Sequence, residues 1–375
     1  MSTIELPRRV LRSVERPARY TGGEWNTVRK DPETRGLMRF AFCFPDIYDI
    51  GMSNLALHIL CNVLNLRDDT WCERCFAPWT DMEARMREEG FPLFSIESRT
   101  PIREFDVVGF TMQYELSFTN VLNMLDLAGI PLRSADRGEG SPLVCCGGPA
   151  AFNIEPMADF FDFVIIGEGE EVIGEVMDLV LRRKRGELSG RPAFLSAAAR
   201  IPGVYVPSLY AVEYLADGCV ASVRPVDENV PSVVRKRILA DLDRAPYPDH
   251  PLVPNTEIVH DRIFLELFRG CTRGCRFCQA GFVYRPVRER SPDTLLGQAI
   301  QAEADTGYDE VGLLSLSTSD YSGLGALTDG LLCALTPHRT SLSLPSLRID
   351  SFSLDLMEKA SSTRKSGLTF APEAG

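Results

Sequence analysis

The stretch "LFRGCTRGCRFCQAGF", from Leu267 to Phe282, holds three of the chain's eleven cysteines within eight residues. Cys271, Cys275 and Cys278 have the spacing Cys-x-x-x-Cys-x-x-Cys. Thiolates gathered on a short loop bind zinc or iron–sulfur clusters, because both prefer soft sulfur ligands. Zinc needs a fourth ligand, but no cysteine or histidine follows nearby, and His260 precedes the adjoining apolar run. A cuboidal iron–sulfur cluster can instead use three cysteines and keep one iron open for a substrate.

Short apolar runs alternate with helical patterns in the first half of the chain. Runs such as "LMRFAFCFP", "FPLFSIES" and "FDVVGFTM" are predicted strands, and "MSNLALHILCNVLNL" is a predicted helix. Alternation of this kind is typical of a parallel sheet covered by helices, and the nearly continuous apolar runs belong in its buried centre. We therefore predict an α/β fold that begins with a Rossmann-like domain over residues 37–185.

Three further segments complete the predicted organisation. Residues 1–36 are a polar, basic arm whose arginines are expected to be solvated. Residues 186–255 contain a hairpin that turns at Asp217-Gly218, followed by a proline-rich connector. Residues 256–375 resume the strand–helix alternation with about four βα units. The cysteine triplet follows the first strand of this array, where parallel-barrel proteins build their sites.

The composition restricts the class of protein. Hydrophobic residues make up 45% and charged residues 25%, as in ordinary globular proteins. A formal net charge of -12 argues against a broad nucleic-acid surface, although a local basic patch would escape this argument. The N-terminus lacks a signal sequence and no run of 18 apolar residues occurs, so we expect a cytoplasmic protein without a membrane partner. In that reducing compartment, clustered cysteines indicate metal or redox sites before disulfides.

The motif "CTRGCRFC" resembles the cluster-binding motif of the radical S-adenosylmethionine enzymes, including the aromatic Phe277 before its last cysteine. The resemblance implies that Cys271, Cys275 and Cys278 ligate a [4Fe-4S] cluster whose open iron chelates S-adenosylmethionine. One electron, from an external donor of the flavodoxin or ferredoxin type, would then cleave the cofactor to methionine and a 5'-deoxyadenosyl radical. The radical chemistry belongs to the cofactor, so no side chain is singled out as catalytic.

The resemblance also extends to the later strand ends of residues 256–375. Phe277, and the polar residues Ser317, Arg348 and Glu373 in "SLSTSDY", "SLPSLRID" and "TFAPEAG", are candidate contacts to S-adenosylmethionine. The polar residues are equally well explained as ordinary strand ends. The family core has six βα units, so the four predicted here indicate a partial, truncated radical S-adenosylmethionine barrel.

The preceding domain resembles the cobalamin-binding domain of one large subgroup of that family. Gly147 and Gly148 match its glycine pair, which would let the backbone approach the nucleotide tail, and "GEGE" (167–170) follows a late strand. The chain departs from the pattern in "DIYDIG" (46–51), where Tyr48 occupies the slot of the cobalt-ligating histidine. Cobalamin is therefore expected to bind without that axial bond, or the fold persists without cobalamin.

Other cysteines suggest weaker alternatives. Cys72 and Cys75 have a Cys-x-x-Cys spacing, but without a second pair they are more simply structural. Cys43 and Cys146 fall at strand ends, as in the cluster-binding methylthiotransferases, but the middle position of that pattern has no cysteine.

The predicted activity is cleavage of S-adenosylmethionine and, with cobalamin, methyl transfer to an unknown substrate. Without cobalamin, it would be hydrogen abstraction followed by rearrangement or sulfur insertion. The alternatives are a non-catalytic cluster- or corrinoid-binding redox sensor and an RNA-modifying, methylthiotransferase-like enzyme.

Overall fold

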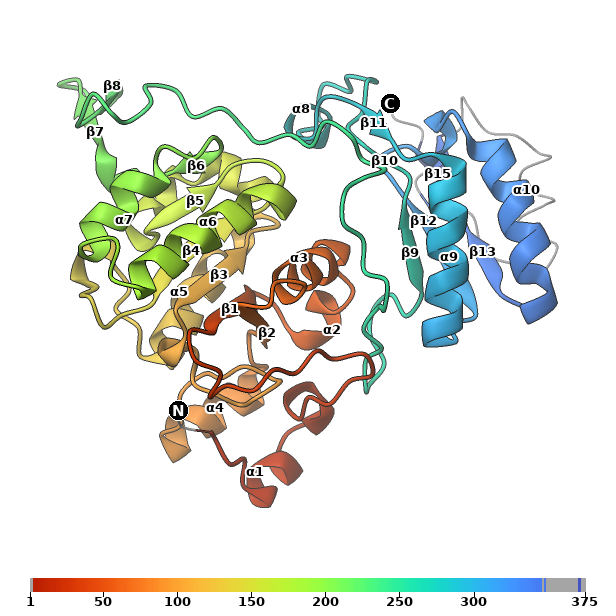
Figure 1. Cartoon of the computed structure of the whole chain (residues 1–375), viewed down its shortest axis with the longest axis horizontal. Helices are drawn as coiled ribbons and strands as arrows, with labels where there is room; N and C mark the ends of the chain where they lie inside the picture. The colour runs from red at the N-terminus through yellow and green to blue at the C-terminus, as the bar shows by residue number, and fades with distance from the viewer. Residues whose placement is uncertain (1–2, 346, 349–369, 372–375) are drawn as a thin grey trace. The chain divides into compact units, whose positions relative to one another are not determined.

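A computed structural model describes residues 3–345, 347–348 and 370–371 of the chain (Figure 1). The contacts within it divide the chain into two compact units. The first unit consists of Met1–Ile238 with Pro254–Ile258, and the second consists of Leu239–Val253 with Val259–Gly375. Both are α/β structures built on parallel strands, which confirms the predicted fold class.

The first unit is organised around a six-stranded sheet in the order β2-β1-β3-β4-β5-β6. All neighbours are parallel except β5 and β6. Every residue of the central strands β1 and β3 is buried, as expected for a sheet covered on both faces. The strands are β1 (Met38–Phe44), β2 (Thr70–Phe76), β3 (Val107–Thr111), β4 (Leu143–Gly147), β5 (Phe163–Ile165) and β6 (Val204–Tyr205).

Amphipathic helices follow these strands and bury their apolar faces. The longest, α6 (Gly169–Lys184), has acidic residues in its first turn and basic residues in its last, an arrangement that complements the helix dipole. The other α-helices are α1 (Arg8–Ser13), α2 (Tyr48–Gly51), α3 (Leu55–Asn65), α4 (Thr80–Glu89), α5 (Phe118–Ala128) and α7 (Gly190–Ala198). Short 3-10 turns are η1 (Pro17–Tyr20), η2 (Ile102–Glu104), η3 (Glu115–Ser117), η4 (Ser134–Asp136), η5 (Pro149–Asn153), η6 (Glu155–Phe160) and η7 (Pro207–Leu209).

Two features of the first sheet differ from the sequence prediction. The predicted strand "FPLFSIES" forms only an isolated bridge between Phe94 and Pro101, and "TWCERCF" forms the edge strand β2 instead. That segment did not resemble a buried strand because it contains Glu73 and Arg74, whose charges are paired inside the unit. The sheet also continues beyond residue 185, the predicted end of the domain, because β6 pairs with β5.

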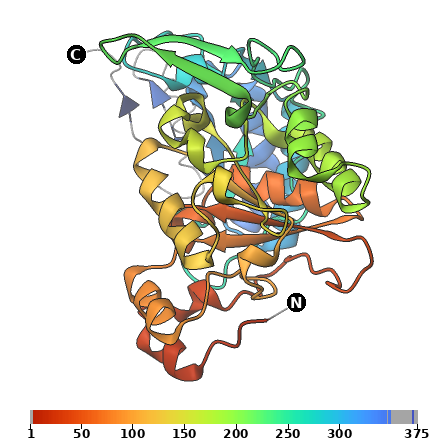
Figure 2. The ribbon, with the colours of Figure 1, turned by 90° about the vertical axis from the view of Figure 1, so that its left-hand side faces the viewer.

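The N-terminal arm packs against the first unit. Val10, Val14 and Tyr20 belong to its hydrophobic core, and Figure 2 shows α1 beside α4. Arg16 and Arg19 donate to the carboxylate of Asp49 at 2.6 Å each. The expectation that all arginines of the arm are solvated is therefore wrong for Arg19, which is buried.

The predicted hairpin is confirmed. Strands β7 (Tyr210–Tyr214) and β8 (Val220–Pro225) are antiparallel, and Gly218 turns between them at φ 86°. A positive φ of this kind is accessible to glycine at little cost.

The second unit contains a three-stranded parallel sheet in the order β13-β12-β9. Helix α9 begins at the predicted cap, Ser291, whose side chain accepts from the amide of Thr294. The strands of this unit are β9 (Ile263–Glu266), β10 (Phe268–Arg269), β11 (Arg288–Glu289), β12 (Glu310–Leu314), β13 (Ser341–Ser343), β14 (Leu347–Arg348) and β15 (Phe370–Ala371). Its helices and 3-10 turns are α8 (Ala280–Val283), α9 (Pro292–Thr306), η8 (Thr318–Asp320), α10 (Leu324–Leu335) and η9 (Thr336–His338).

Among the helices of the described residues, none is both long and apolar enough to cross a lipid bilayer.

Candidate functional site

The three clustered cysteines lie on one loop at the carboxyl end of β9. The loop leaves through β10 and returns through β11, and these two short strands are antiparallel, pairing Phe268 with Glu289 and Arg269 with Arg288. Because β9 is parallel to β12, the loop begins at the sheet edge where β12 also ends. Ligands of open parallel sheets bind at this edge, so the position is suited to a cofactor site.

Two glycines of the loop have backbone conformations that other residues rarely adopt. Gly270 has φ 93°, and a Cβ atom there would lie 2.6 Å from the carbonyl oxygen of Pro286. Gly274 has φ 67° and open space around it. Gly270 is therefore required by both conformation and close packing, whereas Gly274 is required by conformation alone.

The three cysteines of the loop form no disulfide and are partly exposed. The amide of Cys278 donates to the carbonyl of Cys275 at 3.0 Å, so these two cysteines share one tight turn. Within the residues that the structure describes, no group of three His, Cys, Asp or Glu side chains converges as a single-ion site. A cubane cluster does not need such convergence, because each thiolate binds a different iron. Reduced, accessible thiols on a glycine-hinged loop therefore fit a cluster in their chemistry.

Ion pairs connect the end of β9, from which the loop starts, to the residues at both ends of the loop. Glu266 accepts from Arg269 at 2.7 Å and from Arg290 at 3.4 Å. Burial alone would raise the pKa of Glu266, but the two guanidinium groups outweigh that effect and lower it. The carboxylate thus stays ionised at the base of the loop, and the ion pairs hold β9, β10 and the residue after β11 together.

A second ion pair connects the loop to the end of β12. The guanidinium of Arg273, between Cys271 and Cys275, donates from Nε to Oδ2 of Asp320 at 2.7 Å and from Nη2 to Oδ1. Asp320 ends η8, the turn that directly follows Ser317. Ser317 is buried, and its hydroxyl has no hydrogen-bond partner among the described residues. Among the predicted polar contacts to S-adenosylmethionine, Ser317 is thus linked to the cysteine loop through Asp320, whose amide donates to the carbonyl of Ser317 at 2.9 Å.

Two of the other predicted contacts to S-adenosylmethionine, Phe277 and Arg348, have a position in the described part of the fold. Phe277 lies on the cysteine loop with 75% of its surface exposed. Arg348 ends β14, which is parallel to β15, and nothing is described of its side chain. Glu373 lies outside the described residues.

In the first unit, the strand order places a topological switch point between β1 and β3. Chain connections leave these neighbouring strands in opposite directions, and such crevices are where doubly wound sheets bind ligands. The hydroxyl of Tyr114, after β3, donates to Asp46, after β1, at 2.8 Å, and Asn120 donates to the carbonyl of Pro45 at 2.9 Å. Tyr114 and Leu116 are exposed here, so the edge has an apolar surface.

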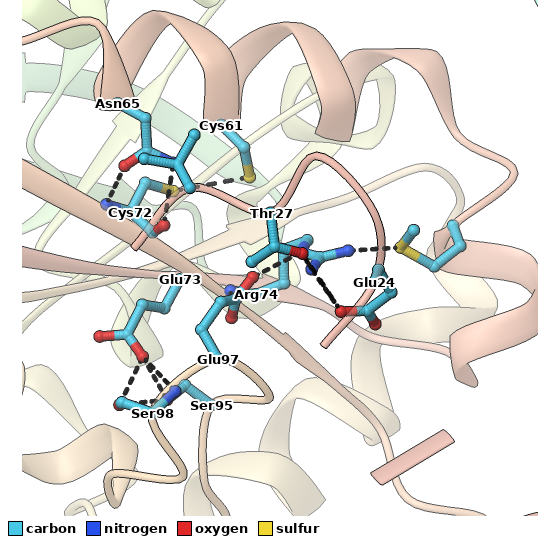
Figure 3. A network of polar contacts seen from close by, with 12 residues as sticks. Glu24, Thr27, Cys61, Asn65, Cys72, Glu73, Arg74, Ser95, Glu97 and Ser98 are labelled. Carbon is cyan, nitrogen blue, oxygen red and sulfur yellow. Dashed lines mark hydrogen bonds and ion pairs between the residues drawn. The ribbon is translucent and has the colours of Figure 1, made fainter. Parts of the chain in front are cut away.

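Tyr48, which occupies the slot of the cobalt-ligating histidine, is buried in a polar network. Its hydroxyl donates to Glu24 of the arm at 3.0 Å, and Glu24 also accepts from Arg74 at 3.0 Å. Figure 3 shows Glu24 and Glu97 beside Arg74 in this network. Burial and the nearby carboxylate of Glu24 raise the pKa of Tyr48. The phenol is therefore neutral and committed to Glu24, and a bond from it to a metal is disfavoured.

The predicted glycine signatures have structural reasons of their own. A Cβ atom on Gly148 would lie 2.7 Å from the carbonyl oxygen of Met112, and one on Gly167 would lie 2.2 Å from that of Arg237. Gly147 ends β4 with only ordinary contacts around its Cβ position. The close approach of Arg237 brings the segment after the hairpin onto the carboxyl end of β5. Sequence patterns could not reveal this contact because Gly167 and Arg237 are far apart in the chain.

The cysteines of the first unit are buried, unlike those of the loop, except for Cys219, which is exposed. Cys72 and Cys75 are three residues apart on one strand, so their side chains project to opposite faces of the sheet and cannot chelate one ion. The thiol of Cys72 lies 3.5 Å from that of Cys61 on α3. Burial raises the pKa values of Cys72 and Cys43 well above the ordinary thiol value. The thiols of Cys72 and Cys43 are therefore protonated, which fits a structural role.

Comparison with protein families agrees with this arrangement. Residues 56–207 match the N-terminal domain of radical SAM proteins, and residues 265–372, which include the cysteine loop, match the radical SAM superfamily. The chain belongs to the radical S-adenosylmethionine (SAM) superfamily, with the cysteine loop in the core domain of that family.

Individual relatives and solved structures resemble the chain over most of its length. An uncharacterised protein of Methanocaldococcus jannaschii is 27% identical over 339 residues, which cover 89% of this chain and 60% of the relative. The radical SAM methyltransferase TsrM from Kitasatospora setae, solved with cobalamin and a [4Fe-4S] cluster, is 12% identical, with a TM-score of 0.52 over 90% of this chain and 61% of TsrM. TsrM with tryptophan substrate and a SAM analogue matches with a TM-score of 0.52, 12% identity, and coverage of 89% and 59%. The likeness to TsrM concerns the fold, and the chain spans about three fifths of the length of these relatives.

Proposed function

We propose that this protein is a radical SAM enzyme whose Cys271, Cys275 and Cys278 hold a [4Fe-4S] cluster. The observation that carries the proposal is the loop itself: three reduced, partly exposed thiols at the carboxyl end of a parallel strand, in the segment that matches the superfamily core. When bound, the cluster supplies the electron that cleaves SAM to methionine and a 5'-deoxyadenosyl radical. An external donor of the flavodoxin or ferredoxin type would provide that electron.

In this proposal, the chain's own residues bind the cluster and SAM and hold them in position. Gly270 and Gly274 let the backbone turn closely around the cluster. The Ser317 hydroxyl, buried without a partner among the described residues, would donate to a polar group of SAM. Leaving such a group unsatisfied costs about 1–3 kcal/mol, so a bound ligand that accepts from it would recover that energy.

The first unit is proposed to bind cobalamin at the switch point between β1 and β3. The exposed Tyr114 and Leu116 would contact the corrin, and Gly147 and Gly148 would lie near the nucleotide tail. Tyr48 would not ligate the cobalt because its hydroxyl is buried and bound to Glu24. With cobalamin present, the reaction would be methyl transfer to a carbon of an unknown substrate. TsrM, which shares the fold, is a methyltransferase.

Anaerobic purification of the chain tests the proposal. We expect about four irons per chain and an optical and electron-paramagnetic spectrum of a [4Fe-4S] cluster that changes when SAM is added. Dithionite with SAM should then yield 5'-deoxyadenosine, and Cys275→Ala should abolish both the spectrum and the product. Cys333→Ala, which alters an exposed cysteine of the same unit outside the loop, is the matched control.

The same preparation separates the alternatives. Bound zinc, or a cluster whose spectrum ignores SAM, would contradict the proposal. A cluster that responds to SAM without forming 5'-deoxyadenosine would favour the redox sensor. A corrinoid absorption in the optical spectrum would support the cobalamin part, and its absence after reconstitution with cobalamin would exclude it.

A further inference from the structure

We propose that Arg273 and Asp320 form a positioning clamp that holds the cysteine loop at a fixed distance from the end of β12. The inference rests on the proposed function, because it concerns the loop that would carry the cluster. Neither residue is a cluster ligand or a predicted contact to SAM. Their role would be to fix the spacing between the cysteines and Ser317.

The geometry of the pair supports this role. Nε and Nη2 of Arg273 donate to the two different oxygens of Asp320, so the guanidinium and carboxylate planes are matched as a fork. A bidentate pair of this kind fixes orientation as well as distance. Arg273 lies midway between Cys271 and Cys275, so the clamp acts on the part of the loop that joins two proposed ligands.

The Asp320 side of the clamp is a well-anchored turn. The amide of Asp320 donates to the carbonyl of Ser317 at 2.9 Å, and Oγ1 of Thr318 donates to the carbonyl of Pro345 at 2.7 Å. Tyr321, the next residue, is buried and donates from its hydroxyl to the carbonyl of Arg290 at 2.7 Å. A shift of the loop at Arg273 is therefore resisted by the same turn that holds Ser317.

The clamp contributes little to overall stability, which makes its effect on the site separable. The side chains of Arg273 and Asp320 are 35% and 22% exposed. Ion pairs with this degree of exposure stabilise folded proteins by about 0–1 kcal/mol. Substitutions of the pair should therefore leave the fold intact while they loosen the loop.

Four variants test the clamp in the anaerobically reconstituted chain: Arg273→Lys, Arg273→Gln, Asp320→Asn and the double change Arg273→Gln/Asp320→Asn. Lysine retains the charge but cannot form the fork, so Arg273→Lys isolates geometry from charge. Arg276→Gln removes another exposed arginine of the same loop and is the matched control. The readouts are iron content, the SAM concentration that half-changes the electron-paramagnetic spectrum of the reduced cluster, and the melting temperature of the apoprotein.

We expect each single variant to raise the half-saturating SAM concentration about tenfold and to lower iron content, with an unchanged apoprotein melting temperature. The double variant should be no worse than Arg273→Gln, because two residues that act through one contact are not additive. Arg276→Gln should behave as the wild type.

Three outcomes would overturn the clamp alone. The first is a wild-type response to SAM and wild-type iron content in Arg273→Lys and Asp320→Asn, and the second is a loss of SAM response and iron content in these variants that Arg276→Gln equals. A melting temperature that falls together with iron content would also overturn it, because the pair would then be structural. If the wild-type chain itself holds no cluster, the proposed function fails, and the clamp fails with it.

Discussion

One ion pair joins strands β1 and β2 of the first sheet, and another holds the cysteine loop, but the two pairs differ greatly in burial. The side chains of Arg39 and Glu73 are 1% and 0% exposed, whereas those of Arg273 and Asp320 are 35% and 22% exposed. A buried pair cannot lose one partner without leaving an uncompensated charge, while an exposed one is replaced by water. The first kind therefore specifies the fold, and the second can only adjust local geometry.

The buried charges of strand β2, Glu73 and Arg74, make many polar contacts. Arg74 donates to Glu97 at 2.6 Å and to Glu24, while Ser95 and Ser98 donate to Glu73 (Figure 3). The guanidinium of Arg39 also lies over the rings of Trp71 and Phe105. Three buried carboxylates, those of Glu24, Glu73 and Glu97, thus pair with two buried guanidinium groups, and the arm supplies one of the carboxylates. The arm is part of the folded unit for this reason.

The largest expected effect follows from breaking the buried pair. Arg39→Met leaves the fully buried Glu73 without its cation, so we expect the free energy of unfolding to fall by about 3–5 kcal/mol. All three tryptophans of the chain, Trp25, Trp71 and Trp79, lie in the first unit. Denaturant unfolding followed by tryptophan fluorescence therefore reports on that unit.

The matched control for this change is Arg9→Met, which breaks an ion pair with Glu89 whose arginine is 71% exposed. We expect that variant to lie within about 1 kcal/mol of the wild type. Equal effects of the two substitutions would show that burial does not distinguish these pairs.

An intermediate effect is expected at the glycines of the cysteine loop. Gly270→Ala introduces a Cβ atom 2.6 Å from the carbonyl oxygen of Pro286 at a positive φ, and such local strain costs on the order of 1–3 kcal/mol. Gly274→Ala meets nothing within 4 Å and suffers only the conformational penalty. We expect iron incorporation to fall several-fold in the first variant and less in the second. The opposite order, or a change in tryptophan-monitored unfolding of the first unit, would contradict this explanation.

The smallest effect is a pH dependence of the buried network. Burial, with Glu73 and Glu24 nearby, raises the pKa of Glu97 to about 7 in spite of Arg74. The folded state then binds a proton that the unfolded state has released above its ordinary pKa of 4.5. The contribution of Glu97 to the free energy of unfolding is therefore fully present below pH 4.5. It declines as the pH rises from there to about 7, by up to about 1.4 kcal/mol per pH unit.

Glu97→Gln should remove this component. Unfolding free energies of the wild type and the variant, measured between pH 5 and 8, should differ by an amount that depends on pH up to about 7 and is constant above it. Because other groups, such as the half-buried His58 with its lowered pKa, titrate in both proteins, only the difference is informative. A difference independent of pH would mean that Glu97 is ionised throughout the range.

Sequence reasoning succeeded where the signal is local. The hairpin at Asp217-Gly218, the cap at Ser291 and the buried strand β3 each follow from a few adjacent residues, and each is present. It failed at β2, because Glu73 and Arg74 looked incompatible with burial. Their partners, Arg39 and Glu24, come from another strand and from the arm, and no local pattern connects them.

In the candidate site too, some features could be predicted from local sequence and others could not. The candidate ligands Cys271, Cys275 and Cys278 were predicted from their spacing, because all three lie within eight residues of the sequence. The pairing of Arg273 with Asp320 and the burial of Ser317 were invisible in the sequence. The reason for Gly167 was also hidden, since it depends on the backbone of Arg237.

The sequence by itself determined the alternation of strands and helices and the position of the cysteine loop, because both depend on the periodicity and chemistry of neighbouring residues. Only the tertiary structure decided which charges are buried together, which strand forms the edge of the first sheet, and what holds Tyr48 and Arg273. Those features depend on groups that are distant in the chain and become neighbours only when apolar surfaces pack and exclude water.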